Sequence, residues 1–264
     1  MDAPATLFHD GKAYERLMGR WSQLVAPKFL DWLDPPKGLR WIDVGCGNGA
    51  FTEVLIAHAA PAAVTGIDPS DGQISYARTR PAAKLAQFRV GDALALPFAD
   101  NSFDAASMAL VITFLADPVK AAREMARVVK PDGIVATYMW DIPGGGFPIR
   151  PLAEAMKSLG LGEPARPNVE ASRRENLQAA WQQAGLRSID TTVIRIRVAF
   201  ADFDDFWNSS SAPIGPSGKA LAEMPPSKVE QLKARLREQL PIAADGSIAY
   251  EAFANAVKGR VPAK

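Results

Sequence analysis

The sequence predicts an α/β fold in which helices cover both faces of a mostly parallel, doubly wound sheet. Between residues 39 and 141, short β-branched apolar runs alternate with longer helical patterns, which is typical of successive βαβ units. A glycine-rich turn follows the first of these runs, at the junction where open α/β sheets bind nucleotides. The chain has 264 residues, 48% hydrophobic and 22% charged, which indicates an ordinary globular protein.

The core elements follow in order along this segment. We predict strands at 39–44, 64–68, 87–90, 104–110 and 134–140, and helices at 51–59, 71–78 and 117–130. Asp117 can cap the last of these helices and Pro118 suits its first turn, whereas Pro131, Asp132 and Gly133 should end it.

The flanking segments give the chain three predicted parts: a helical cap at 1–38, the ligand-binding α/β core at 39–141, and a region at 142–264 that completes the sheet and covers the ligand. The cap carries a helix at 14–33 that Pro27 should bend or split. The last part begins with a glycine hinge at 144–146. It continues with a helix at 175–184, a sixth strand at 187–200, and a helical insertion at 202–240 with a loop at 209–218 and a helix at 227–240. Residues 248–261 are long enough for a last strand, although by propensity alone their alanines also suit a helix.

Composition excludes several classes of function. The formal net charge of +1 lacks the basic footprint of a nucleic-acid-binding protein, and no apolar run is long enough to span a membrane. One cysteine and two histidines make an internal disulfide impossible and a metal site improbable. No secretory signal is recognisable at the start, so we expect a cytoplasmic protein without metal, nucleic acid or membrane insertion.

The glycine turn indicates a ligand but does not by itself choose one. Gly45, Gly47 and Ala50 satisfy the dinucleotide-binding pattern, which leaves a nicotinamide cofactor and an adenosine cofactor open. Asp43 adds a carboxylate that would repel a pyrophosphate and attract an α-ammonium group. Asp68 ends the second strand, where a carboxylate can accept both ribose hydroxyls. Asp92 ends the third strand in the same way.

Several segments match one family in order along the chain. They are the glycine turn with its strand at 41–49, the second-strand end at 66–70, the turn at 91–98 with 102–104 after it, and the helix-to-strand segment at 123–133. Together they resemble the class I S-adenosylmethionine-dependent methyltransferases, in particular the type-11 group of small-molecule methyltransferases that includes quinone-ring C-methyltransferases. Residues 14–22 are similar to the N-terminal cap of one branch of this family.

The resemblance implies a Rossmann-like sheet of seven strands with an antiparallel last strand, S-adenosylmethionine as the cofactor, and a small-molecule methyl acceptor. It implies that Arg20 holds the methionine carboxylate, that Tyr14 lies against the sulfonium, and that Asp92 with Ala93 binds the adenine. The expected cofactor-binding residues are Tyr14, Arg20, Asp43, Gly45, Cys46, Gly47, Asp68, Pro69, Gln73, Asp92, Ala93, Met108 and Ala109.

The sequence identifies no catalytic base. Thr113 stands where many members of the family have histidine, while Tyr138 and Asp141 are weak candidates near the end of the fifth strand. Asp132 replaces the usual glycine, a change that a type I turn should tolerate. Cys46 and His58 are interpreted as a small turn residue and a solvated helix-end residue, rather than as catalytic groups.

Two alternatives to a methyltransferase remain open from the residues. An NAD(P)-dependent reductase would share the first βα turn, and a non-catalytic module could keep S-adenosylmethionine as a structural ligand. Five aromatic residues at the end of the fifth strand and in the third part are expected to pack in the core or the cover, with a minority interpretation in which they line the acceptor site. They are Trp140, Phe147, Phe203, Phe206 and Trp207. The acceptor atom and the oligomeric state are not predicted.

Overall fold

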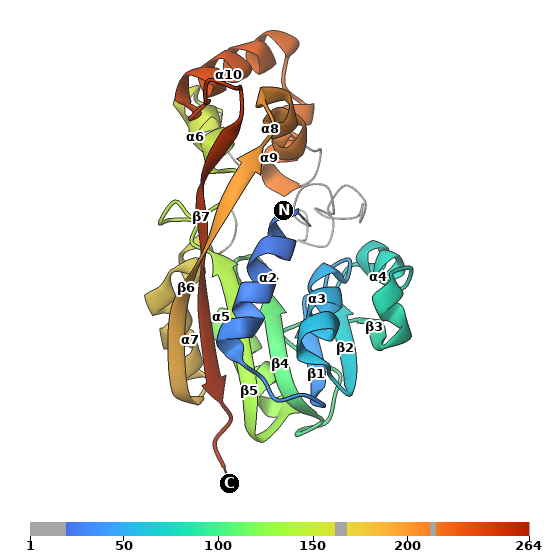
Figure 1. Cartoon of the computed structure of the whole chain (residues 1–264). Helices are drawn as coiled ribbons and strands as arrows, with labels where there is room; N and C mark the ends of the chain where they lie inside the picture. The colour runs from blue at the N-terminus through green and yellow to red at the C-terminus, as the bar shows by residue number, and fades with distance from the viewer. Residues whose placement is uncertain (1–19, 162–167, 212–214, 264) are drawn as a thin grey trace.

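A computed structural model describes residues 20–161, 168–211 and 215–263 (Figure 1). Its seven-stranded sheet has the order β3-β2-β1-β4-β5-β7-β6, and β7 runs antiparallel to both of its neighbours. This confirms the predicted fold class, including the single reversed strand at the end of the chain. The strands are β1 (Arg40–Val44), β2 (Ala63–Asp68), β3 (Ala86–Val90), β4 (Phe103–Ala109), β5 (Val129–Trp140), β6 (Arg187–Phe200) and β7 (Ile248–Arg260).

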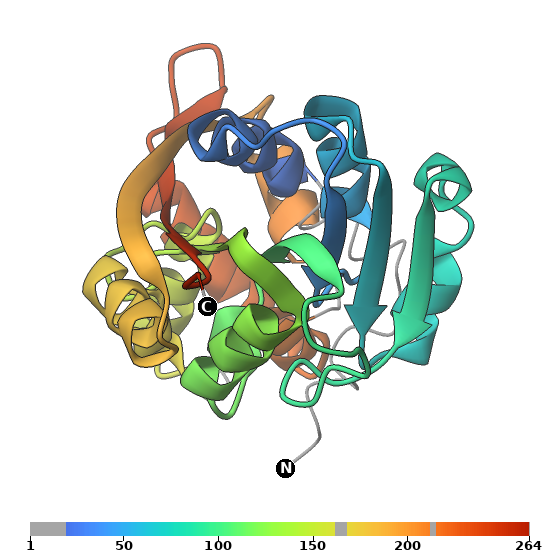
Figure 2. The same cartoon turned by 90° about the horizontal axis from the view of Figure 1, so that it is seen from below.

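Helices cover both faces of the sheet. Figure 2 shows α2 and α3, in blue, on one face and α5, in green, on the other. No helix among the described residues is long and apolar enough to cross a bilayer. The α-helices are α2 (Arg20–Leu33), α3 (Ala50–Ala59), α4 (Asp71–Ala77), α5 (Pro118–Val128), α6 (Arg150–Ser158), α7 (Arg174–Gln183), α8 (Phe203–Ser210), α9 (Gly215–Ala222) and α10 (Pro226–Gln239).

Strands β6 and β7 are longer than the parallel strands and continue past them as a two-stranded ribbon. Trp140, the last residue of β5, pairs with Ala254, whereas β6 and β7 stay paired as far as Phe200 and Ile248. Helices α8, α9 and α10 lie at the end of this ribbon, toward which the carboxyl ends of the parallel strands point (Figure 1). Trp21 of α2 packs edge-on against Phe200, with ring centroids 5.4 Å apart, so the helical cap and the ribbon are in contact.

The connection into β5 differs from the predicted one. Asp132 has a φ of 62°, in the left-handed region, so the expected type I turn is wrong. Aspartate is one of the few residues that enters this region at modest cost, which is why the position tolerates the loss of glycine. Val129 already pairs with Phe103 and Ile134 pairs with Ala105, so β5 begins earlier than predicted and bulges between the two pairs.

Two helices were not predicted. Helix α9 includes residues 215–218, which were expected to lie in a loop because their glycines and proline indicate a turn by propensity. Helix α6 follows the three-glycine segment, which forms a hydrogen-bonded turn. Within it, Gly146 N donates to Asp141 O at 2.6 Å and Phe253 N of β7 donates to Gly146 O at 3.0 Å.

Candidate functional site

The glycine turn between β1 and α3 is held against β2. Gly45 N and Cys46 N both donate to Ile67 O, at 2.7 and 3.0 Å. Gly45 has a φ of 73°, and a Cβ built on it would lie 2.4 Å from a methyl carbon of Val111. Gly47 has a φ of 51°, but a Cβ there would meet no atom of the described residues within 4 Å. The first glycine is therefore required by packing as well as by conformation, whereas the second leaves open space beside the backbone.

Asp68 joins the glycine turn to the end of β2. Its Oδ2 accepts a hydrogen bond from Gly47 N at 3.0 Å, and its Oδ1 accepts one from Ser70 N at 2.9 Å. Burial raises the pKa of this carboxyl, although the two backbone hydrogen bonds oppose the increase. A carboxylate has about four lone-pair sites, so Asp68 keeps acceptor capacity for hydroxyl groups.

Asp43 lies beneath the turn and is completely buried. Its Oδ2 accepts a hydrogen bond from Thr52 Oγ1 on α3 at 2.6 Å, while its Oδ1 has no partner among the described residues. Burial raises the pKa of this carboxyl to about 7, Thr52 lowers it, and the charge of Asp68 raises it further. Sequence reasoning missed Thr52, whose position in the first turn of the helix after the glycines was the available signal.

Cys46 is also buried, and burial raises the pKa of its thiol well above the usual value, with Asp43 and Asp68 adding to the effect. A protonated, enclosed thiol is a poor nucleophile. This supports the interpretation of Cys46 as a small turn residue. His58 is exposed in the last turn of α3, as expected for a solvated residue.

The turn after β3 carries Asp92 and Ala93. Asp92 is exposed, and its Oδ1 accepts a hydrogen bond from Leu94 N at 2.9 Å, while Ala93 is buried. Gly91 N donates to Asp68 O at 3.1 Å, so this turn lies directly beside the end of β2. The carboxylates of Asp68 and Asp92 therefore flank one pair of strand ends.

A cluster on α5 fixes the rest of this turn, and sequence reasoning missed it. Arg127 donates to Leu96 O at 2.9 Å and to Phe98 O at 2.8 Å. The same guanidinium holds Glu124, whose Oε2 accepts from Leu96 N at 2.8 Å. Hydrogen bonding to Arg127 lowers the pKa of Glu124. The i, i+3 spacing of these opposite charges was the sequence signal for the pair, but nothing local indicated the carbonyl groups.

The other expected cofactor residues divide into two groups. Gln73 and Met108 are buried, Ala109 is half-buried at the end of β4, and Pro69 is exposed after β2. These four lie at or after the carboxyl ends of β2 and β4, beside the glycine turn. Tyr14 lies outside the described residues, and Arg20 begins α2 without a described side chain.

The three positions considered for a base have other contacts. Thr113 is buried in the short 3₁₀ helix after β4, where its Oγ1 lies 3.9 Å from Met139 Sδ. Tyr138 packs against Phe29 and Phe51, with ring centroids 4.7 and 5.9 Å away. Asp141 caps the glycine turn by accepting from Gly144 N at 2.8 Å. These contacts support packing or turn-forming roles for all three residues.

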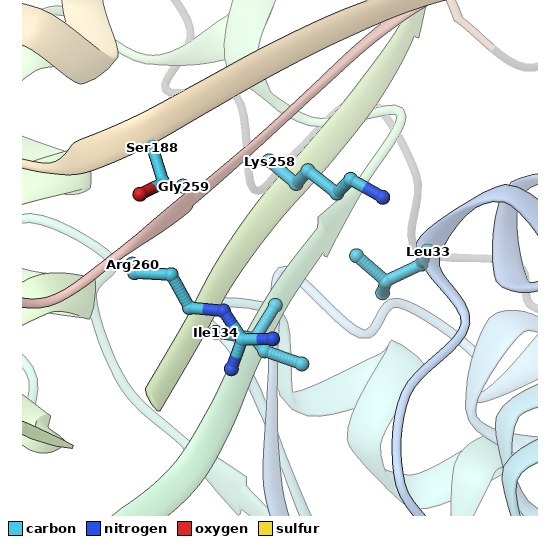
Figure 3. Close-up of a pocket in the computed structure, with 6 residues that line it drawn as sticks. All are labelled: Leu33, Ile134, Ser188, Lys258, Gly259 and Arg260. Atoms are coloured by element: carbon cyan, nitrogen blue, oxygen red, sulfur yellow. The ribbon is translucent and has the colours of Figure 1, made fainter. Parts of the chain in front are cut away.

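A small pocket lies at the opposite end of the sheet (Figure 3). Its basic side chains are engaged by the chain itself, because Lys258 Nζ donates to Trp32 O at 2.9 Å and Arg260 donates to Asp132 O at 2.9 Å. The described residues also contain no cluster of three metal-ligating side chains. The lining residues are Leu33, Ile134, Ser188, Lys258, Gly259 and Arg260.

Comparisons with known proteins identify the relatives of this chain. Residues 42–137 match a family model described as a methyltransferase domain. A demethylmenaquinone methyltransferase from Corynebacterium kroppenstedtii is 30% identical over 63% of this chain and 78% of its own length. An O-methyltransferase from Penicillium expansum is 35% identical over 62% of this chain, which spans only 57% of that relative.

Solved structures show the same fold. A phosphoethanolamine N-methyltransferase from Haemonchus contortus, solved with phosphomonomethylethanolamine and S-adenosylhomocysteine, superposes with a TM-score of 0.61 at 19% identity. The match covers 96% of this chain and 57% of that one. At this level of identity the likeness establishes the fold alone.

Proposed function

Because the chain belongs to the methyltransferase-domain family, we propose that it transfers a methyl group from S-adenosylmethionine to a small-molecule acceptor. The observation that carries the proposal is the hydrogen bond from Gly47 N to Asp68 Oδ2. It joins a glycine turn that a ligand can approach to a carboxylate that can accept ribose hydroxyls. Family membership favours an adenosyl ligand over the nicotinamide ligand that the glycine pattern alone left open.

The residues present suit this cofactor. The described residues leave open space beside Gly47 for the ligand backbone and give Oδ1 of Asp43 no partner, so this oxygen is an acceptor for an α-ammonium group. Asp68 would accept the ribose hydroxyls, and Asp92 with Ala93 would bind the adenine. Arg20 would hold the carboxylate, and Tyr14 would lie against the sulfonium.

The chemistry requires position more than covalent catalysis. When bound, S-adenosylmethionine supplies an electrophilic methyl group on a sulfonium. The protein residues hold the two reactants in line, which can provide a large part of the acceleration. Helices α8, α9 and α10 would cover the acceptor and exclude water from the nucleophile. A base is needed only where the acceptor arrives protonated.

The relatives guide the choice of acceptor. One is named an O-methyltransferase and another a demethylmenaquinone methyltransferase, so we infer a small organic acceptor that is methylated at oxygen or carbon. The balanced charge of the chain supports a small molecule rather than a nucleic acid. The use of a single cysteine is compatible with a reaction in the cytoplasm.

Isothermal titration with S-adenosylmethionine, S-adenosylhomocysteine, NADH and NADPH in one buffer tests the proposal. We expect the two adenosyl ligands to bind and the two nicotinamide nucleotides not to bind. Binding of a nicotinamide nucleotide alone would overturn the assignment of Asp43 and Asp92. A panel of phenols and hydroquinones with methyl-labelled S-adenosylmethionine then tests transfer, because a non-catalytic module would bind the donor without giving a product.

A further inference from the structure

The indole N–H of Trp140 is buried without a hydrogen-bond partner among the described residues. Trp140 is the last residue of β5, at the carboxyl edge of the sheet. An indole nitrogen can only donate, so this group needs an acceptor atom. Leaving such a donor unsatisfied in the interior costs stability, and a native structure that retains one calls for an explanation.

Two other buried tryptophans show that position must be considered together with pairing. Trp181 Nε1 donates to Val135 O at 2.9 Å, so this fold does satisfy a buried indole where a carbonyl is within reach. Trp41 Nε1 has no partner among the described residues, but Trp41 lies near the start of β1, away from the carboxyl edge. An unpartnered indole alone therefore does not identify a site, and the location of Trp140 supplies the second argument.

Trp140 lies on the face of the sheet that carries α2 and α3. Tyr138, two residues earlier, packs against Phe29 of α2 and Phe51 of α3, and alternate residues of a strand share a face. Trp140 is thus one step nearer the carboxyl edge than this aromatic cluster. Its neighbour on β7 is Ala254, whose methyl side chain offers no polar atom.

The distance from the glycine turn suits an acceptor. Only β4 lies between β1 and β5, so the ends of these two strands are separated by two strand spacings, or about 10 Å. A methyl donor held by the glycine turn after β1 and an acceptor bound at the end of β5 would therefore lie at the same edge of the sheet, close enough to be neighbours. The ribbon of β6 and β7 and the helices beyond it stand over the same edge (Figure 1).

We propose that Trp140 is an acceptor-binding residue whose indole N–H donates a hydrogen bond to an oxygen of the methyl acceptor. The proposal deepens the proposed function and rests on it, because it places the acceptor at the end of β5. It specifies the acceptor class as a largely apolar molecule with a carbonyl or hydroxyl oxygen. Molecules of the same shape without that oxygen should bind less well.

The direct test follows the tryptophan indole signals by ¹H–¹⁵N NMR in the S-adenosylhomocysteine complex during titration with 1,4-naphthoquinone, a flat probe with two carbonyl oxygens. Trp140→Phe assigns the Trp140 signal by its disappearance. We expect this proton signal to move downfield by more than any other indole signal, because it gains a hydrogen bond. Naphthalene, which has the same ring system without oxygens, should not produce this shift.

Affinities give a second, independent readout. Trp140→Phe should weaken the binding of naphthoquinone about five- to tenfold, the effect of one hydrogen bond, and should change naphthalene binding by less than about twofold. Trp41→Phe is the matched control, since it also removes a buried, unpartnered indole N–H, and it should alter neither affinity. S-adenosylhomocysteine binding should be unchanged in both variants.

The outcomes separate this inference from the function on which it rests. A stationary Trp140 signal, a lack of naphthoquinone binding, or an equal loss for both probes would overturn the inference alone, provided that S-adenosylhomocysteine still binds. Failure of S-adenosylhomocysteine to bind the wild-type protein would overturn the inference and the proposed function together.

Discussion

Replacing Asp43 with asparagine should make the stability of the protein less dependent on pH between 5 and 8. Asp43 is completely buried, and its pKa rises from 3.8 to about 7, first because of burial. A raised pKa means that the folded state holds its proton more tightly than the unfolded state. The contribution of Asp43 to stability is therefore complete below pH 3.8 and is lost as the pH rises to about 7.

The magnitude follows from this pKa. At about 1.4 kcal/mol per pH unit, the full loss amounts to roughly 4 kcal/mol, of which about 2.5 kcal/mol falls between pH 5 and pH 8. Asparagine keeps an oxygen for Thr52 and places an amide NH₂ at the position of Oδ1, which has no partner in the described part of the chain. That buried amide costs about 1–3 kcal/mol at every pH, so it cancels in a comparison between two pH values.

Urea denaturation of the ligand-free protein at pH 5 and pH 8, followed by tryptophan fluorescence, measures the effect. The free energy of unfolding of Asp43→Asn minus that of the wild type should increase by about 2.5 kcal/mol from pH 5 to pH 8. Thr52→Val is a useful comparison, because it removes the hydroxyl donor that lowers the pKa of Asp43 and should steepen the pH dependence. A difference that stays constant across this range would refute the buried, protonatable state of Asp43.

Three further predictions concern the glycine turn and the strand ends beside it. Asp68→Ala should weaken S-adenosylmethionine binding by at least about thirtyfold, because it removes a charge-assisted pair of hydrogen bonds, whereas Asp71→Ala, at an exposed neighbouring position, should have little effect. If calorimetry finds the same affinity for Asp68→Ala and the wild type, the ribose assignment is wrong. Arg127→Lys should weaken the same binding about three- to tenfold, because an ammonium cannot hold both carbonyl groups of the turn after β3, and an unaltered affinity would contradict this. Gly45→Ala should destabilise the fold by several kcal/mol in urea denaturation, because the added Cβ would clash with Val111, which follows β4. Gly38→Ala is the control: Gly38 has a φ of 78° but no described atom within 4 Å of an added Cβ, so the change should cost only about 1 kcal/mol. Similar losses in the two variants would show that the structure relieves the clash.

The sequence allowed much of the fold to be predicted, together with the position of Gly47 and Asp68 at one edge of the sheet. Glycines after the first strand and acids at the ends of the next two strands mark the carboxyl edge, because parallel strands end on one side. The structure adds that Asp68 and Gly47 are hydrogen-bonded to each other. The spacing of these residues could place both at the same edge of the sheet, but it could not show that the Asp68 carboxylate accepts a hydrogen bond from Gly47 N.

What could not be predicted depends on contacts between distant segments. Arg127 contacts the carbonyl groups of Leu96 and Phe98, about thirty residues away along the chain. Asp132 was misassigned because its conformation is set by the bulge between β4 and β5 rather than by local turn chemistry. Helix α9 was missed because tertiary packing can override the low helix propensity of glycine and proline.

The ribbon of β6 and β7 has a consequence for how such a protein can diversify. Phe200 and Ile248 form the last residue pair of this ribbon, so the segment that carries α8, α9 and α10 leaves the sheet and rejoins it at the same place. A segment attached in this way can be lengthened, shortened or exchanged without shifting the register of any strand in the sheet. Helices α8, α9 and α10 can therefore change while the part of the molecule that carries Asp43 and Asp68 is left unaltered.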